Sequence, residues 1–266
     1  MSAAVAVARA WAPDVRPGFL RRLNPLAKVA ATLPAAVLLV VWHEAAAALV
    51  LGGVAAVLLV VGAGLRPRVL AGLLVAAPLA AAVVGAALGL WVAPGTTTGS
   101  PVLVRLGSWT YTQAALVEGL GTVARLYAVL LLTSVGGLTT TGPDLVRASQ
   151  QQLRVPYRVG WTALAAFRFV PRFGHELAVI RAAHRVRGTD TGTGPVADLR
   201  RYVGYAVPLL AGALRHAERV ALAMDARAFG AHPTRTERYR VPWRHRDSAL
   251  VATTWAVTLA TWLLLR

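Results

Sequence analysis

The sequence predicts an all-α, polytopic membrane protein with about five transmembrane helices and a separate, basic helical domain. The 266-residue chain is 56% hydrophobic, its mean hydropathy is +0.57 and only 15% of its residues are charged, whereas soluble domains carry roughly 25% charged residues. The apolar residues gather in runs of about 20 residues, the length that a helix needs to cross a bilayer. The charge is concentrated elsewhere, between Pro143 and Asp247.

Four apolar runs in the first half of the chain satisfy this length requirement, and they cover residues 26–43, 45–65, 69–92 and 112–138. A fifth run covers residues 248–265. Arg21 and Arg22 before the first run would also suit a cleaved signal peptide, but the next run begins within a few residues and no A-x-A cleavage site intervenes between the two runs. We therefore expect a retained membrane helix.

The distribution of basic residues predicts the orientation in the membrane, because cytoplasmic connections carry an excess of arginine and lysine. Basic residues precede the first run, and Arg66 and Arg68 lie in the second connection. The third connection, 93–111, carries only Arg105. We expect the N-terminus to be cytoplasmic and the 93–111 loop to lie outside the cell.

Residues 143–247 hold 18 of the 28 basic residues and 8 of the 11 acidic ones. Such a charged region is expected to stay on the cytoplasmic side as a unit of its own. The predicted domains are therefore an N-terminal membrane domain of four transmembrane helices (1–142), a cytoplasmic helical domain (143–247) and a C-terminal transmembrane helix (248–266).

Three helices are expected in the cytoplasmic domain. The first begins at Pro143 with Gly142 as its cap, since proline suits the first turn of a helix. The second covers 156–188, and Pro171 inside it should bend it. The third runs from about residue 196 to 229.

The segment 202–214 in the third helix is apolar enough to resemble a membrane span. It is only about 13 residues long, and arginines bracket it on both sides. Such a segment suits a buried or interfacial helix better than a transmembrane one, so we expect the whole of 143–247 to remain on one side of the membrane.

The two long cytoplasmic helices end alike, the second in "HRVRG" (184–188) and the third in "DARAF" (225–229). Each ending places an arginine, Arg187 or Arg227, between small or slim neighbours. A cation at a helix C-terminus gains about 0.3–1 kcal/mol from the helix dipole, and one such arginine would need no other explanation. Two similar endings predict a two-pronged cationic surface for docking on two copies of an acidic or grooved partner.

These endings resemble the paired X-Arg-X motifs, commonly Ala-Arg-Gly, of the transmembrane T component of energy-coupling factor transporters, the EcfT/CbiQ family. Most of the chain carries the resemblance, in the stretches "LNPLAKVAATL", "TTTGPDLVRASQQQLRVP", "LAAFRFVPRFGHELAVIRAAHRVRG" and "AVPLLAGALRHAERVALAMDARAFG". Val186 stands where the first motif has alanine, and Ala228 stands where the second has glycine.

The resemblance implies a coupling subunit that hydrolyses nothing and binds no cofactor or metal, since ATP and Mg would be bound by its partners. The implied partners are two ABC ATPase subunits, a substrate-binding S component for a vitamin or an ion such as cobalt or nickel, and membrane lipids, but no nucleic acid. Arg187 and Arg227 would each enter a groove on one ATPase. The motifs would be completed by Val186, Gly188, Ala226 and Ala228. Six further residues are implied to support the coupling helices: Arg168, Pro171, Glu176, Arg185, Glu218 and Asp225.

Two other groups of residues admit two interpretations each. Glu118 and Arg125 lie seven residues apart in the fourth span; they either tie helices together or serve transport, because intramembrane charges are often functional. Trp161, Phe169 and Phe173 form either a packing stripe or an apolar platform on which an S component slides.

Two other classes of protein are alternatives to a transporter subunit. A nucleic-acid-binding membrane protein would account for the net charge of +17, but the arginines follow the expected cytoplasmic loops. A membrane enzyme would need paired catalytic groups at membrane depth, where Glu118 is the one carboxylate. The six histidines show no metal-ligand spacing.

Overall fold

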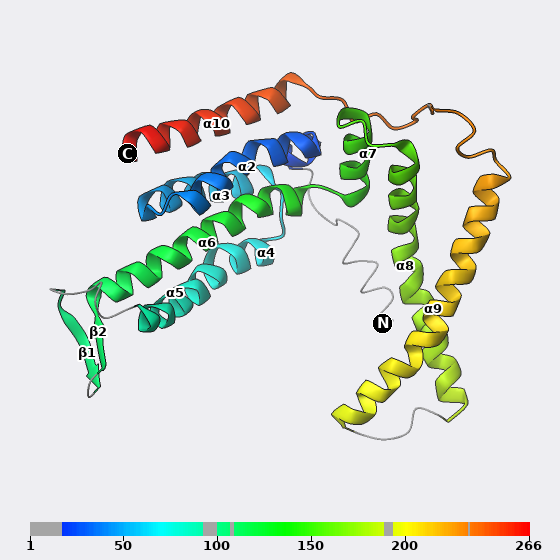
Figure 1. Cartoon of the computed structure of the whole chain (residues 1–266), viewed down its shortest axis with the longest axis horizontal. Coiled ribbons are helices and arrows are strands. Elements are labelled where there is room, and N and C mark those ends of the chain that lie inside the picture. Colours follow the sequence, from blue (N-terminus) through cyan, green and yellow to red (C-terminus); the bar gives the residue numbers. More distant parts are fainter. Residues whose placement is uncertain (1–17, 93–99, 107–108, 189–193, 234) are drawn as a thin grey trace. The chain divides into compact units, whose positions relative to one another are not determined.

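The computed structural model describes residues 18–92, 100–106, 109–188, 194–233 and 235–266, and it confirms an all-α membrane protein (Figure 1). The elements in chain order are η1 Phe19–Arg22, α2 Pro25–Val41, α3 Ala45–Gly62, α4 Pro67–Ala71, η2 Gly72–Ala76, α5 Ala77–Leu88, η3 Gly89–Trp91, β1 Val102–Leu106, β2 Trp109–Thr112, α6 Gln113–Thr139, α7 Gly142–Gln152, α8 Tyr157–Val186, α9 Pro195–Asp225 and α10 His245–Leu265.

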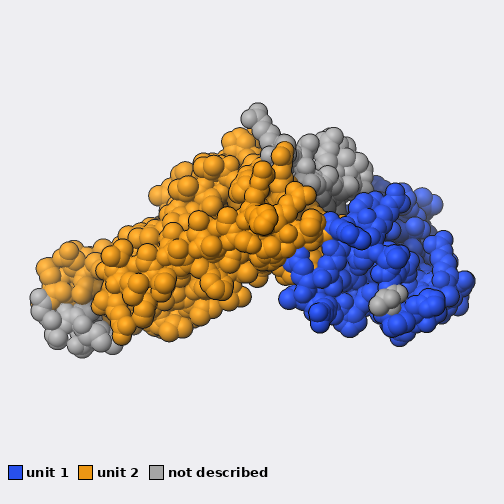
Figure 2. All heavy atoms as spheres, turned by 90° about the horizontal axis from the view of Figure 1, so that it is seen from above, with its two compact units in different colours: residues 1–14, 149–240 blue, residues 15–148, 241–266 orange. Residues whose placement is uncertain are grey.

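The chain forms two compact units, which Figure 2 shows in different colours. The first, which we call the bundle unit, consists of residues 15–148 and 241–266. The second, which we call the two-helix unit, contains residues 149–240 together with 1–14, and its described part is built around α8 and α9. The chain therefore leaves the bundle unit within α7, after Ala148, and returns to it just before α10.

In the bundle unit, α2, α3, α6 and α10 lie side by side, and α5 runs along α6 (Figure 1). Their shared core contains leucines and many alanines, including Leu51, Leu59, Leu131 and Leu132. Because lipid is as apolar as leucine, helices in a membrane associate mainly through close packing of small residues. The alanine-rich helices of this sequence suit that kind of packing.

The contact between α5 and α6 is the closest example. A Cβ added at Gly119 of α6 would meet the carbonyl oxygen of Gly85 and would lie 2.7 Å from the backbone nitrogen of Gly89. Because backbone atoms cannot move aside as a side chain end can, glycine is required at this position for the two helices to approach.

Four helical stretches are long and apolar enough to cross a membrane, namely Ala45–Gly62, Pro67–Trp91, Gln113–Thr139 and His245–Leu265. They correspond to four of the five spans that the sequence predicts. The first predicted span corresponds to α2, which is apolar but has 17 residues, at the short end of the range for a transmembrane helix. The helix α9, which contains 202–214, does not meet the same criteria.

The connection before α6 contains a feature that the sequence did not predict. β1 and β2 form an antiparallel hairpin with an irregularity between Val102 and Val104. β2 leads directly into α6, and Thr112 caps that helix by accepting a hydrogen bond from the Ala115 N–H at 3.3 Å. The runs "VLVRL" and "WTYT" are rich in β-branched and aromatic residues, which favour strands.

The start of α7 differs from the prediction. Thr141, and not Gly142, caps the helix: its hydroxyl accepts from the Asp144 N–H at 3.3 Å and donates to the Asp144 carboxylate at 2.6 Å. The physical reason is that threonine brings a side-chain oxygen to the unpaired N–H groups of the first turn, whereas glycine has none.

The two long helices of the two-helix unit match the predicted ones closely, except at one end. α8 covers Tyr157–Val186 and continues through Pro171. α9 begins at Pro195 but ends at Asp225, four residues before the predicted end, and residues 226–230 form a turn. This turn contains one of the two arginines that the sequence singles out.

Candidate functional site

The end of α8 places Arg187 in a defined helix-ending motif. Arg187 follows the last helical residue, and its N–H donates to the Ala183 carbonyl at 3.1 Å. Gly188 comes next with φ of 67°, and its N–H donates to the Arg185 carbonyl at 3.1 Å. A residue with positive φ just past the helix is a common way to end it, and glycine adopts this conformation most easily.

The end of α9 repeats this geometry. Ala228 has φ of 53°, and its N–H donates to the Asp225 carbonyl at 2.9 Å. The Phe229 N–H donates to the Met224 carbonyl at 3.0 Å, which completes the pair of bonds of a Schellman motif. Arg227 therefore occupies the position that Arg187 has in α8, immediately before the residue with positive φ.

Both arginines are available to a partner. Arg187 and Arg227 are exposed, and Val186 beside the first is 90% exposed. Within the residues that the structure describes, neither guanidinium has a hydrogen-bond or ion-pair partner. Ala226, Ala228 and Gly188 are also exposed, and these neighbours have a methyl side chain or none.

Contacts between α8 and α9 show that the two helices run antiparallel. At one end, the Tyr157 hydroxyl donates to the His232 carbonyl at 2.8 Å, and its ring meets Phe229 edge-on at 5.6 Å. At the other end, the ring of His184 meets Tyr205 edge-on at 5.2 Å. The start of α8 therefore lies by the end of α9, and the end of α8 lies by the start of α9.

As a consequence, the two arginines lie at opposite ends of the helix pair. Gly204, which lies beside His184 near the end of α8, precedes Arg227 by 23 residues. At a rise of 1.5 Å per residue along α9, Arg187 and Arg227 are on the order of 30 Å apart. Two separate binding sites, and not one shared groove, would be needed to receive both.

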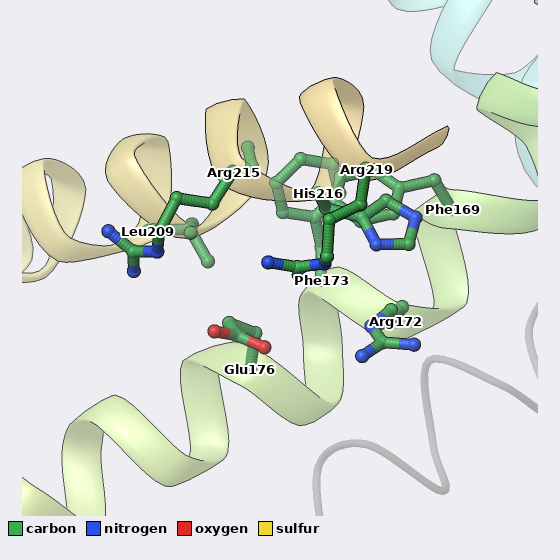
Figure 3. Close-up of a pocket in the computed structure, with 10 residues that line it drawn as sticks. Phe169, Arg172, Phe173, Glu176, Leu209, Arg215, His216 and Arg219 are labelled. Atoms are coloured by element: carbon green, nitrogen blue, oxygen red, sulfur yellow. The ribbon is translucent and has the colours of Figure 1, made fainter. Parts of the chain in front are cut away.

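The helices cross in their middle parts (Figure 1), and an open cleft lies between them there (Figure 3). Phe169 stacks on His216 of α9 with ring centroids 4.5 Å apart, and it meets Phe173 edge-on at 4.3 Å. These two aromatic residues of the predicted stripe therefore pack between the helices. Glu176 faces Gly212, where an added Cβ would lie 3.0 Å from the Glu176 Oε1.

Arginines surround this cleft, with Arg172 from α8 and Arg215 and Arg219 from α9 (Figure 3). The third aromatic residue of the stripe, Trp161, lies outside it, and the Arg235 guanidinium covers its ring at 4.4 Å. Arg235 could not be expected there from the sequence, because it lies in a loop far along the chain from Trp161.

The remaining predicted residues of this unit do not converge on the cleft or on one another. Arg168, Pro171, Arg185, Glu218 and Asp225 are all exposed on the surfaces of α8 and α9. The structure thus brings Glu176 to the helix crossing and leaves the other five on the outside of the pair.

The two charged residues of α6 are linked through Thr122, but through the backbone of Glu118 and not through its carboxylate. The Arg125 Nη2 donates to the Thr122 hydroxyl at 3.0 Å, and that hydroxyl donates to the Glu118 carbonyl at 3.0 Å. The Glu118 side chain is exposed. Within the described ranges, no three histidine or acidic side chains lie close enough together to hold a metal ion.

Comparison with known proteins adds to this geometry. The family described as "Cobalt transport protein" (CbiQ) matches residues 18–238. The chain is similar to the "Energy-coupling factor transporter transmembrane protein EcfT" of Bacillus subtilis (strain 168), with 27% identity over 159 residues, which are 57% of this chain and 60% of that protein.

Proteins with the same description are similar in Limosilactobacillus fermentum (strain CECT 5716 / Lc40), at 32% identity over 181 residues, or 61% of this chain and 67% of that protein, and in Staphylococcus aureus (strain 04-02981), at 29% over 160 residues, or 57% and 60%. The matched part of the chain spans about three fifths of the length of the first of these relatives.

Proposed function

Since the chain belongs to the cobalt transport protein family CbiQ, we propose that it is the energy-coupling membrane subunit of an energy-coupling factor importer. It links ATP hydrolysis by two ATPase subunits to movement of an S component that carries a vitamin or a metal ion, and it performs no catalysis itself. The observation that supports this most is that Arg187 and Arg227 occupy equivalent positions at the ends of α8 and α9.

The side chains of Arg187 and Arg227 are both suited to binding a partner protein. An arginine presents a permanent charge and five donors that match carboxylates and carbonyls, and such charge-assisted hydrogen bonds strengthen when a partner excludes water. The partner must therefore offer a groove that is deep enough for the guanidinium and lined with acceptors. The separation of Arg187 and Arg227 along the helix pair favours one prong for each of two ATPase subunits.

In this proposal, residues 143–247 and the N-terminus lie in the cytoplasm, where ATPases are found. The excess of arginine in these regions supports this orientation. The same charge attracts anionic lipid headgroups at the cytoplasmic surface, so the net charge of +17 needs no nucleic acid partner.

The outer face of α9 supports a second contact. Val203, Val207, Leu210 and Leu214 recur at helical spacing, and each is more than 60% exposed. A stripe of this kind on a charged helix suits an interface with lipid or with an apolar protein surface. We assign it to the membrane boundary and to the S component.

The helix crossing supports the proposed motion. When the ATPases close on ATP, Arg187 and Arg227 move with them, and the angle between α8 and α9 changes. The cleft beside Glu176 and Gly212 leaves room for such a change, and the absence of a Cβ at Gly212 keeps the crossing point narrow. The change of angle would shift the surface on which the S component rests.

The test is co-purification with the two ATPases expressed alongside the chain. Arg187→Glu or Arg227→Glu should weaken attachment of the ATPases, and the double variant should abolish it while the protein remains in the membrane. Arg240→Glu makes the same change of charge at an exposed arginine away from both helix ends, and it should co-purify normally. A double variant that still retained both ATPases would rule out the docking role.

A further inference from the structure

A buried lysine in the bundle unit has no part in the proposed docking. Lys28, in the first turn of α2, is 1% exposed. Its Nζ donates to the Thr139 carbonyl at 2.9 Å and lies 3.2 Å from the Thr139 hydroxyl. Thr139 is the last residue of α6, so the ammonium group meets carbonyls that have no partner within the helix and carry the negative end of its dipole.

Asn24, four residues before Lys28, makes a second set of buried contacts. The Asn24 side chain caps α2 by accepting from the Leu26 N–H at 2.9 Å. Its Nδ2 donates to the Val241 carbonyl at 3.3 Å, and its backbone N–H donates to the Asp247 Oδ1 at 2.7 Å. Asn24 therefore binds the segment that leads into α10.

Asp247 joins this contact to α10 itself. It is 1% exposed, and its Oδ2 accepts from the Arg244 N–H at 2.7 Å, which caps the helix. A buried carboxylate that lost these donors would be left with an uncompensated charge, which is strongly destabilising. The contact is therefore expected to resist opening.

The contacts of Lys28 and Asn24 both connect the start of α2 to segments near the places where the chain passes between the two units. The end of α6 leads into α7, within which the chain leaves the bundle unit after Ala148, and the chain returns to the bundle unit at Val241. A single short segment, residues 21–28, contacts both segments: Lys28 and Arg21 bind the end of α6, the latter through the Leu138 carbonyl at 3.4 Å, and Asn24 binds the return.

We propose that Asn24 and Lys28 are positioning residues for energy coupling, which hold the end of α6, just before α7, and the returning segment at Val241 together. The inference rests on the proposed function. While these contacts are intact, a displacement of residues 149–240 moves α6 and α10 directly. If these contacts were lost, the connecting segments could move without moving α6 and α10. ATP hydrolysis would then continue without movement of the bundle unit.

Lys28→Met tests this, because methionine keeps the apolar stem and removes the three donors. Arg22→Met is the matched control, since Arg22 carries the same charge nearby but is exposed. The complete complex with its ATPases and S component is used, and only assembled complexes are measured. Spin labels on Arg68→Cys in the bundle unit and Val196→Cys in the two-helix unit report the ATP-dependent change of distance, and ATP hydrolysis is measured on the same samples.

We expect the Lys28→Met complex to hydrolyse ATP at close to the normal rate while the ATP-dependent population shift falls at least fivefold, the lower end of typical coupling energies. Arg22→Met should match the unsubstituted chain. Thr139→Val, which keeps the carbonyl and removes only the hydroxyl, should give a smaller loss, and it provides the test if Lys28→Met does not fold.

Two outcomes separate this inference from the proposed function. If the unsubstituted chain assembles and shows the ATP-dependent change, and neither Lys28→Met nor Thr139→Val alters it, the positioning role is wrong and the proposed function stands. If the unsubstituted chain binds no ATPase, the proposed function fails, and the positioning role fails with it.

Discussion

Arg187 and Arg227 each lie at the end of a long helix, immediately before a residue with positive φ. That next residue differs, however: it is Gly188 at φ of 67° in α8 and Ala228 at φ of 53° in α9. The left-handed conformation costs an L-residue other than glycine roughly 1–2 kcal/mol. The end of α9 therefore carries a strain that the end of α8 does not.

Ala228→Gly should relieve this strain and stabilise the protein by about 1 kcal/mol. It should also let the turn approach a partner more closely, so ATPase attachment should be as strong or stronger. Thermal unfolding in detergent and co-purification measure the two effects. Gly188→Ala places the same strain on α8 and should destabilise by a similar amount. A destabilising Ala228→Gly would contradict the assigned turn.

Gly119→Ala should destabilise the bundle unit, because the added methyl group would meet the backbone of Gly85 and Gly89 in the neighbouring helix. Overpacking of this kind costs typically about 1–3 kcal/mol. Gly136 lies in the same helix with nothing within 4 Å of an added Cβ, so Gly136→Ala should be neutral or stabilising by helix propensity. Equal unfolding temperatures for the two variants would contradict the packing of α5 on α6.

The orientation can be tested by labelling, because the chain contains no cysteine. Val196→Cys in the first turn of α9 and Thr236→Cys beyond its end should both react with a membrane-impermeant maleimide only from the cytoplasmic side. Ser100→Cys should react only from outside. Labelling of Val196→Cys and Thr236→Cys from opposite sides would make α9 a membrane span and would separate the two prongs.

The helices of this protein could be predicted from the sequence because apolar runs and charge clusters mark them directly. Four predicted spans and the two long helices of the two-helix unit agree with the structure to within a few residues. The largest error is at the end of α9, where "ARAFG" continues the helical composition but forms a turn. Alanine at position 228 gave no sign of a positive φ, because this conformation is unusual for it.

Contacts between distant parts of the chain could not be predicted in the same way. Nothing in the sequence pairs Lys28 with Thr139 or Asn24 with Val241, since these contacts depend on how α2, α6 and α10 pack. The sequence signal that could have indicated them is the lysine itself: Lys28 is the one lysine among 28 basic residues, and it lies within an apolar helix. The two arginine endings were found because each is a local pattern.

The measurement that tests the central claim most directly is cross-linking of the two prongs to the ATPases. Val186→Cys and Ala226→Cys place a thiol beside Arg187 and Arg227, and each is treated with a thiol-reactive photo-cross-linker in the assembled complex. We predict that each single cysteine captures one ATPase subunit, that the chain with both captures two, and that Ser100→Cys captures none. Capture of no ATPase at either position, or of a single subunit by the chain with both cysteines, would contradict the account.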